Sequence, residues 1–194
     1  MTAPSAPLNV LALCGSLRKD SINAALLRAA ARLATPAADI EVPDWLGRLP
    51  LFNPDLEAEA ELPRVVQALH LAVANADALL IASPEYAHGV SGTIKNTLDW
   101  LVSFEPFIHK PVAIINASPR ARHADAALRE TLRTMSAGLV GEVSFAVELL
   151  GARMDEDAMV ASAGVAAVVA EVVAALRAEI ARQAGADVPV FPLR

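Results

Sequence analysis

A turn rich in hydrogen-bonding side chains follows the first apolar run of the chain, at residues 15–23. Its sequence is Gly-Ser-Leu-Arg-Lys-Asp-Ser-Ile-Asn. The hydroxyls of Ser16 and Ser21 and the amide of Asn23 can donate hydrogen bonds, and the guanidinium of Arg18 adds positive charge. The turn also leads into a helical pattern, and a helix N-terminus contributes unpaired N–H groups and a positive dipole end. These features predict an anion site, and the anion that suits them best is a phosphate.

The residues after this turn indicate where the helix begins. Apolar residues recur there at helical spacing: Ile22, Ala25, Leu26, Ala29, Ala30 and Leu33. Ser21 is then the expected N-cap. By itself the turn has a second interpretation, in which Ser21 only caps the helix and Arg18 is a solvated side chain.

Apolar runs alternate with helical patterns along the whole chain. Three runs are short and almost wholly apolar, which is typical of strands covered on both faces: Leu8 to Cys14, Ala78 to Ala82 and Val112 to Ala117. Two weaker strand candidates are Ile40 to Val42 and Val143 to Val147. Strand and helix alternate five times, which predicts an α/β fold with a parallel sheet and helices on both faces.

Ligands of open parallel sheets bind at the carboxyl ends of the strands, so the loops that follow the strands are candidate binding segments. The third strand is followed by Ser-Pro-Glu-Tyr-Ala-His-Gly-Val-Ser-Gly at 83–92. A rigid proline and two glycines around an aromatic ring can present backbone N–H and C=O groups to a planar heterocycle. The other interpretation is an ordinary loop before a helix at Thr93 to Val102.

Three motifs together resemble the NADPH-dependent FMN reductase family. They are Gly15-Ser16-Leu17-Arg18-x-x-Ser21-x-Asn23, Pro84-Glu85-Tyr86 and Lys95-Asn96-x-x-Asp99-Trp100. Members of this family are flavodoxin-like and include quinone, chromate and azo-dye reductases. The resemblance extends from about Leu8 to Val147. It implies a flavodoxin-like three-layer sandwich with a five-stranded parallel sheet in the order 2-1-3-4-5 and helices on both faces.

The resemblance also implies a binding site for FMN, because the turn at 15–23 would hold a single phosphate and FAD would need room for its adenylate. The residues that would contact the phosphate are Ser16, Arg18, Ser21 and Asn23. Those that would lie along the flavin ring are Pro84, Glu85, Tyr86 and Ala87, with Ser118 on the other side. His88 either contributes directly, as a hydrogen-bond or proton donor, or makes a structural hydrogen bond.

The activity that this site implies is FMN-dependent NAD(P)H oxidoreduction. A hydride would pass from NADPH or NADH through FMN to an acceptor such as a quinone, free flavin, an azo compound or chromate. The alternative is a non-catalytic FMN-binding electron carrier or sensor of the same fold.

Three positions depart from the family pattern. Ala87 stands where asparagine is frequent, and Ser91 stands where proline is common, which predicts a looser loop. The loop after the fourth strand, Pro119 to His123, is bulkier and more basic than the glycine-containing family loop. Arg120 and Arg122 there either meet the phosphates of a nicotinamide dinucleotide or are simply solvated.

The composition limits the number of domains, the classes of partner and the cellular location that we expect. The 194 residues, 55% of them hydrophobic, suit a single domain over 1–194 with a substantial core. A net charge of −6 without long basic runs argues against nucleic-acid and anionic-membrane partners. Ala158 to Ala170, the longest uncharged helical candidate, is too short to span a bilayer, so we expect a cytoplasmic protein.

Cysteine and histidine content argues against a metal centre. The single cysteine, Cys14, excludes an internal disulfide and a Cys-rich metal site, and its apolar setting predicts a buried, inert thiol. The four histidines form no recognisable ligand set, so no metal is expected.

The resemblance further implies a homodimer or homotetramer with the flavin at a subunit interface. The best candidate surface is the apolar helix Ile94 to Val102, extended by Trp100, Phe104 and Phe107. Packing of the same residues in the core is the competing interpretation.

Overall fold

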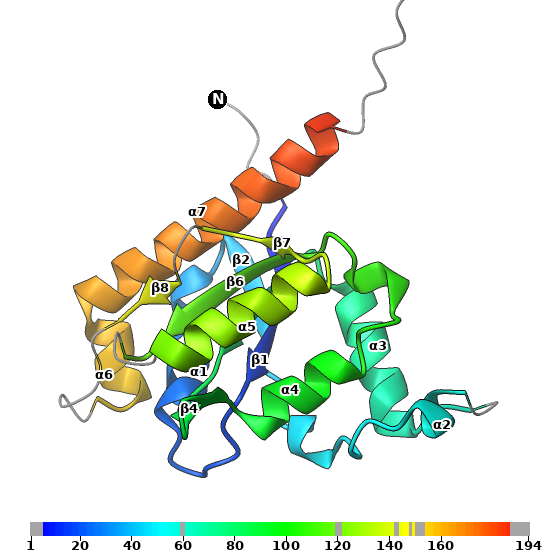
Figure 1. Ribbon diagram of the computed structural model, residues 1–194. Helices are drawn as coiled ribbons and strands as arrows, with labels where there is room; N and C mark the ends of the chain where they lie inside the picture. Colours follow the sequence, from blue (N-terminus) through cyan, green and yellow to red (C-terminus); the bar gives the residue numbers. More distant parts are fainter. Residues whose placement is uncertain are drawn as a thin grey trace, which may run out of the picture.

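Four parallel strands form the centre of the sheet in the computed structural model, which describes residues 6–58, 61–118, 122–141, 144–147, 149 and 154–186. The strands are β1 (Leu8–Cys14), β2 (Ala38–Glu41), β3 (Ala78–Ala82) and β6 (Pro111–Asn116) (Figure 1). Almost every residue of β1, β3 and β6 is buried, because helices cover both faces of the sheet. The β2 strand lies at 38–41 rather than at the expected 40–42.

The strands lie in the order β2-β1-β3-β6, and all neighbours are parallel. Because β6 is the fourth long strand along the chain, this order confirms the first four positions of the predicted 2-1-3-4-5 arrangement. The fifth position differs from the prediction. Two short strands, β7 (Gly138–Leu139) and β8 (Phe145–Ala146), both pair with β6, so the sheet has six strands among the described residues instead of the expected five.

The division of the fifth strand has a local cause. Gly141 has a φ of 77°, a backbone conformation that favours glycine, and it turns the chain between β7 and β8. The buried guanidinium of Arg129, on α5 (Arg122–Thr134), donates to the carbonyl oxygen of Gly141 and to the hydroxyl of Ser144. These bonds hold the chain in that turn. The single strand expected at 143–147 is therefore reduced to β8, and Val143 lies outside the described residues.

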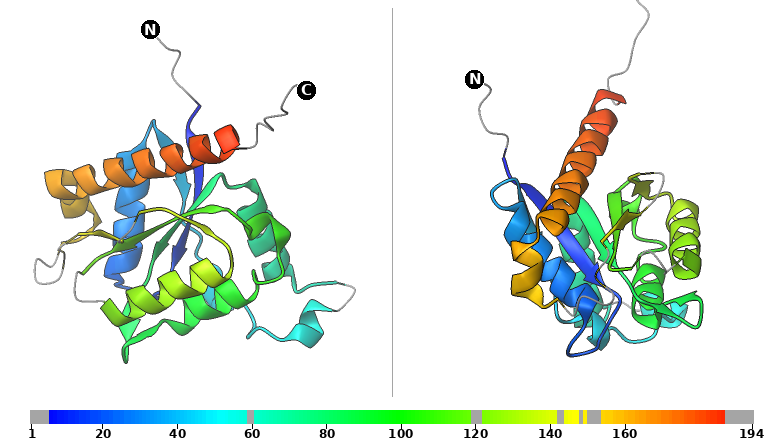
Figure 2. Two further views of the ribbon diagram at one scale, coloured as in Figure 1. Left: turned by 45° about the horizontal axis from the view of Figure 1, so that its top comes forward. Right: turned by 90° about the vertical axis from the view of Figure 1, so that its left-hand side faces the viewer.

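Helices cover both faces of the sheet and complete the three predicted layers (Figure 2). The helices α1 (Ile22–Ala34), α6 (Glu156–Ala161) and α7 (Ala163–Ala186) pack on the face that includes Val10 and Ala12. The helices α3 (Arg64–Asn75), α4 (Gly92–Asp99) and α5 pack on the face that includes Leu11 and Leu13. Successive residues of β1 point to opposite faces, so one strand supplies both halves of the core.

The uncharged stretch at 158–170 is divided between two helices. Ser162 ends α6, and its hydroxyl then accepts a hydrogen bond from the N–H of Val165 at the start of α7. Within the described residues, no helix is both long enough and apolar enough to cross a membrane.

The long connection between β2 and α3 is held against α4. It contains η1 (Leu46–Arg48) and α2 (Pro54–Glu57). The amide of Asn96 donates to the carbonyl oxygen of Pro50 at 2.9 Å and accepts from the N–H of Phe52 at 2.8 Å. The indole of Trp100 donates to the same Pro50 oxygen at 2.8 Å, and its ring meets that of Phe52 edge to face. The third family motif therefore clamps this connection onto α4.

The structure decides between the two interpretations of the apolar residues of α4, an interface or the core. Most of the apolar side chains proposed for that surface are at most 1% exposed and belong to the core: Ile94, Leu98, Trp100, Leu101 and Phe107. They are buried because α4 turns its apolar side to the sheet and the clamped connection covers Trp100. The exceptions are Val102, at 62% exposed, and the half-buried Phe104.

We expect the substitution Asn96→Ala to lower the free energy of unfolding by about 1–3 kcal/mol, because it removes two hydrogen bonds to the connection. Chemical denaturation measures this change. The exposed Asn75, whose side chain bonds to none of the described residues, supplies the control. Asn75→Ala should change the free energy of unfolding by less than about 0.5 kcal/mol. Equal effects of the two substitutions would contradict a stabilising role for the hydrogen bonds of Asn96.

Candidate functional site

The loops that follow β1, β3 and β6 meet at one edge of the sheet, because these strands are parallel neighbours (Figure 1). The first two loops are joined directly, since the backbone N–H of Gly15 donates to the carbonyl oxygen of Ala82 at 2.8 Å. A methyl group on Gly15 would lie 2.4 Å from the hydroxyl oxygen of Ser83. Only glycine allows this approach, so Gly15 is a structural requirement of the site.

Residues 15–23, the anion loop, lead into the N-terminus of α1. The hydroxyl of Ser21 accepts a hydrogen bond from the N–H of Ala24 at 3.2 Å, so Ser21 is the N-cap of this 13-residue helix. The hydroxyl of Ser16 accepts from the N–H of Arg18 at 3.4 Å, which turns the loop. Arg18 is exposed and makes no ion pair with the described residues.

Asn23, in the first turn of α1, provides a test of whether an anion fits the loop. The residue is only 5% exposed, yet its amide forms no hydrogen bond with the described part of the chain. Buried amides are normally hydrogen-bonded, because desolvation without a partner costs a few kcal/mol. No side-chain polar atom in the described residues is both fully enclosed and unbonded, so the amide of Asn23 keeps some accessible surface. The donors present therefore fit a phosphate group.

The loop after β3 forms a hairpin that was not expected from the sequence. Its strands β4 (Glu85–Tyr86) and β5 (Gly89–Val90) are antiparallel. The two residues of the turn, Ala87 and His88, have φ values of 49° and 60°. Left-handed conformations at both positions are typical of type I′ turns, in which Asn-Gly is the usual pair. Ala-His lacks that signal, and each residue carries strain of about 1–2 kcal/mol.

The hairpin is attached to the first turn of α5. The carboxylate of Glu85 accepts a hydrogen bond from the N–H of Ala124 at 2.9 Å, where the helix dipole is positive. The ring of His88 stacks on that of His123, with centroids 4.3 Å apart. Tyr86 is 58% exposed beside them. Glu85 and His88 therefore both hold the hairpin in place in this structure.

Residues beyond β6 complete the edge. Ser118 is half-buried, and residues 119–121, which include Arg120, lie outside the described chain. Arg122 is exposed at the start of α5.

A polar network that the sequence did not predict fixes the end of β6. The amide of Asn116 donates to the carboxylate of Asp125 at 2.9 Å, and Ser144 donates to the same oxygen. The only sequence signal is Arg129, a charged residue between the periodic Leu128 and Leu132 of α5.

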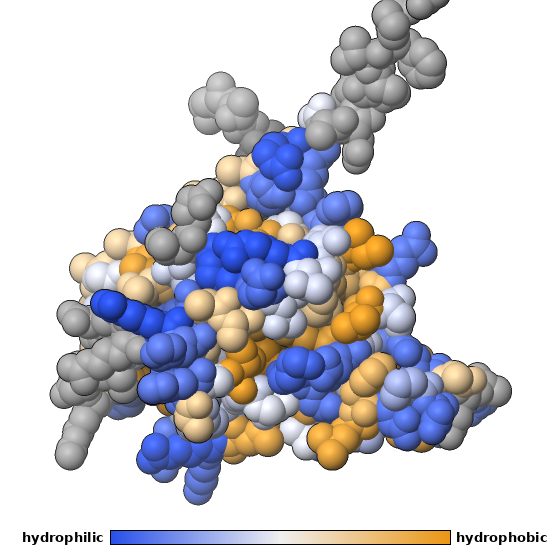
Figure 3. Space-filling view, in the orientation of Figure 1, coloured by the Kyte–Doolittle hydropathy of each residue, from blue (hydrophilic) through white to orange (hydrophobic). Residues whose placement is uncertain are grey.

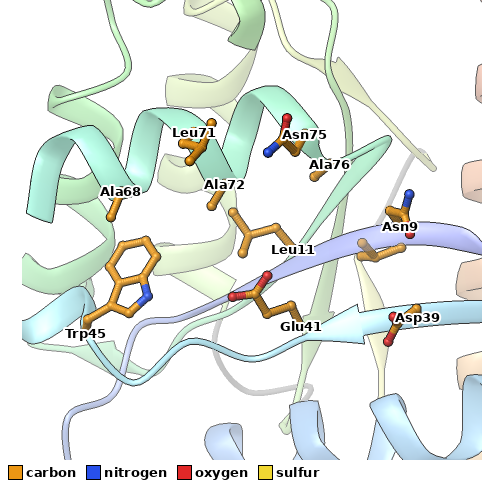
Figure 4. Close-up of a pocket in the computed structure, with 11 residues that line it drawn as sticks. Asn9, Leu11, Asp39, Glu41, Trp45, Ala68, Leu71, Ala72, Asn75 and Ala76 are labelled. Atoms are coloured by element: carbon orange, nitrogen blue, oxygen red, sulfur yellow. The ribbon is translucent and has the colours of Figure 1, made fainter.

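Two cavities border β1, one along its first half and one at its carboxyl end. One of about 470 Å³ is on the far side of β1, between β2 and α3, where Leu11, Glu41 and Trp45 line it (Figure 4). A second, of about 300 Å³, adjoins the anion loop and is lined by residues that include Ser16 and Arg18. Among the described residues, no group of three or more histidine, cysteine and acidic side chains could hold a metal ion.

Ser91, expected to loosen the hairpin, is instead a well-bonded N-cap of α4. Its hydroxyl accepts from the N–H of Ile94, and it also contacts Ser83. Its φ of −60° is the value that proline imposes, which explains why either residue fits this position.

The sequence model of the NADPH-dependent FMN reductase family matches residues 8–150. The chain belongs to this family. The match covers the anion loop, the hairpin and the end of β6, and it confirms the resemblance seen in the motifs. The fold is correspondingly flavodoxin-like.

Relatives of this FMN reductase family member include proteins from plants and bacteria. An NADPH:quinone oxidoreductase of Arabidopsis thaliana is 45% identical over 121 residues, which cover 60% of this chain and 61% of that protein. An NAD(P)H-dependent FMN reductase of Pseudomonas aeruginosa is 41% identical over 113 residues, which cover 57% of this chain and 60% of that protein. The chain thus spans about three-fifths of the length of these relatives.

A solved structure shows the same likeness in three dimensions. The flavoenzyme NAD(P)H:(acceptor) oxidoreductase of Paracoccus denitrificans superposes with a TM-score of 0.75 at 28% identity. The superposition covers 89% of this chain and 98% of that structure.

We expect the thiol of Cys14 to be inert in the native protein, because burial raises its pKa. Labelling with a thiol reagent at pH 8 should be at least about tenfold slower in the folded than in the denatured protein. Because burial disfavours the thiolate, this group leaves the stability of the fold unchanged below the unfolded thiol's pKa of about 8.5 and lowers it as the pH rises from there through the raised folded pKa. Rapid native labelling would contradict the burial.

Proposed function

We propose that the protein is an FMN-dependent NAD(P)H oxidoreductase that reduces a small acceptor such as a quinone, free flavin, an azo compound or chromate. The observation that carries this proposal is the junction at Gly15, which joins a phosphate-type site to a hairpin suited to a flat ring. The names of the relatives, which include quinone and FMN reductases, support the same chemistry.

The residues have distinct parts in this proposal. The phosphate of FMN would be held by the side chains of Ser16, Arg18 and Asn23 and by the N-terminus of α1, which Ser21 begins. The backbone of residues 84–87 would lie along the ring, and Ser118 would close the other side. Bound FMN supplies the redox chemistry, which is hydride transfer from the nicotinamide to the acceptor.

The surroundings of the hairpin favour an anionic reductant. Arg122 at the N-terminus of α5 is exposed near this edge, and the ring of the neighbouring His123 stacks on His88 of the hairpin. Positive charge there attracts the phosphates of NADPH or NADH, which supports an enzyme over an electron carrier.

The test of the phosphate site is the substitution Arg18→Ala. It should raise the FMN dissociation constant about 10- to 100-fold, because a charge-assisted hydrogen bond is worth about 1.5–3 kcal/mol. Riboflavin, which lacks the phosphate, should bind equally to both proteins. Arg64→Ala, at an exposed position at the start of α3 and outside the anion loop, is the control and should leave FMN binding unchanged within about twofold. Fluorescence titration measures all of these constants.

Two outcomes would reject the assignment. Purified protein that does not take up FMN would exclude a flavoprotein. Protein that binds FMN but does not oxidise NADPH or NADH in the presence of quinones, free flavin, azo dyes or chromate would be an electron carrier or sensor.

We also propose that the protein is a homodimer or homotetramer whose interface lies beside the site. Three exposed apolar side chains belong to segments around it: Leu17 at 65%, Leu51 at 83% and Tyr86 at 58%. Figure 3 shows hydrophobic surface next to α4. Exposed apolar groups of this kind support an interface.

We expect Leu51→Lys to shift the unmodified oligomer toward monomer in light-scattering measurements, because burying an unpaired ammonium in an interface is unfavourable. Leu71→Lys, at a 63% exposed position on α3, is the control and should leave the assembly unchanged. A monomeric unmodified protein would reject the proposed assembly.

A further inference from the structure

Two buried serines connect the segments on either side of the hairpin. Ser83 follows β3 and is 8% exposed, and Ser91 precedes α4 and is 3% exposed. The hydroxyl of Ser83 donates to the hydroxyl oxygen of Ser91 at 3.2 Å. The two ends of the hairpin are thus joined by one hydrogen bond between side chains.

The same two hydroxyls support the anion loop. An added methyl group on Gly15 would lie 2.4 Å from the oxygen of Ser83 and 2.7 Å from that of Ser91. The backbone of Gly15 therefore rests directly on the serine pair, and its N–H is held by Ala82. The pair lies where the anion loop and the hairpin come closest.

Ser91 adds a third connection. Its hydroxyl accepts a hydrogen bond from the N–H of Ile94 at 3.3 Å, so the side chain that contacts Ser83 also caps α4. One hydroxyl thereby contacts the end of the hairpin, the start of α4 and the backbone of Gly15. Any change in its position moves the hairpin relative to the anion loop.

We propose that Ser83 and Ser91 are positioning residues that set the spacing between the anion loop and the hairpin, and so determine how strongly the site prefers FMN over riboflavin. This inference rests on the proposed flavin-binding function. A ligand that occupies both segments binds tightly only if their spacing is fixed beforehand, because otherwise binding must also order the loops. A ligand that uses the hairpin alone does not depend on that spacing.

The test compares FMN and riboflavin binding to Ser83→Ala and Ser91→Ala by fluorescence titration of the flavin-free protein. Each substitution should raise the FMN dissociation constant about three- to tenfold, which corresponds to one lost buried hydrogen bond. The riboflavin constant should change less than about twofold. The double variant should bind FMN no more weakly than Ser91→Ala, because both substitutions break the same bond.

Ser162→Ala is the matched control, since Ser162 is also an N-cap serine but belongs to α7. It should lower the melting temperature as Ser91→Ala does and leave the ratio of the two flavin constants unchanged. Ser83→Ala removes no helix cap, so it tests the pair even where Ser91→Ala fails to fold.

The outcomes separate this inference from the function on which it rests. Equal weakening of FMN and riboflavin, no weakening of either, or additive effects in the double variant would overturn the positioning role while leaving a flavoprotein. Unmodified protein that binds neither flavin would refute the proposed function and this inference with it.

Discussion

The close approach of Gly15 to the end of β3 is the constraint on which the candidate site depends. β1 and β3 are adjacent parallel strands about 4.8 Å apart, so the loops after them begin side by side. They can stay together only because residue 15 has no side chain and its N–H binds the carbonyl of Ala82. This contact places a helix N-terminus next to the hairpin, which neither loop could achieve alone.

The hairpin after β3 contains backbone strain that the surrounding contacts stabilise. Ala87 and His88 adopt left-handed conformations that neither residue prefers. Antiparallel pairing, the bond from Ala124 to Glu85 and the stack on His123 together hold them there. Because these contacts come from the surrounding fold, the backbone of the hairpin is already shaped before any ligand binds.

Much of the fold could be predicted because the evidence for it is local. The apolar runs of β1, β3 and β6, the helical spacing after Ser21 and the N-cap itself are all visible within a few residues. The fifth strand differs from the prediction because a buried arginine and a glycine turn interrupt it. The sequence left open whether the apolar residues of α4 form an interface or the core, and they lie in the core, where a distant connection covers Trp100. The type I′ hairpin was missed because Ala-His carries none of the usual turn signals.

Periodicity and residue type thus sufficed for the α/β class, the order of elements and the chemistry of the anion loop, since hydrophobic spacing selects helix or strand from neighbours in the chain. The hydrogen-bond partners of Asn96, Glu85 and Arg129 could not be predicted from periodicity and residue type. Asn96 binds a carbonyl 46 residues away, and Glu85 binds an N–H 39 residues away. Such pairs form only after packing has brought the elements together, because their hydrogen bonds leave no repeating pattern along the chain.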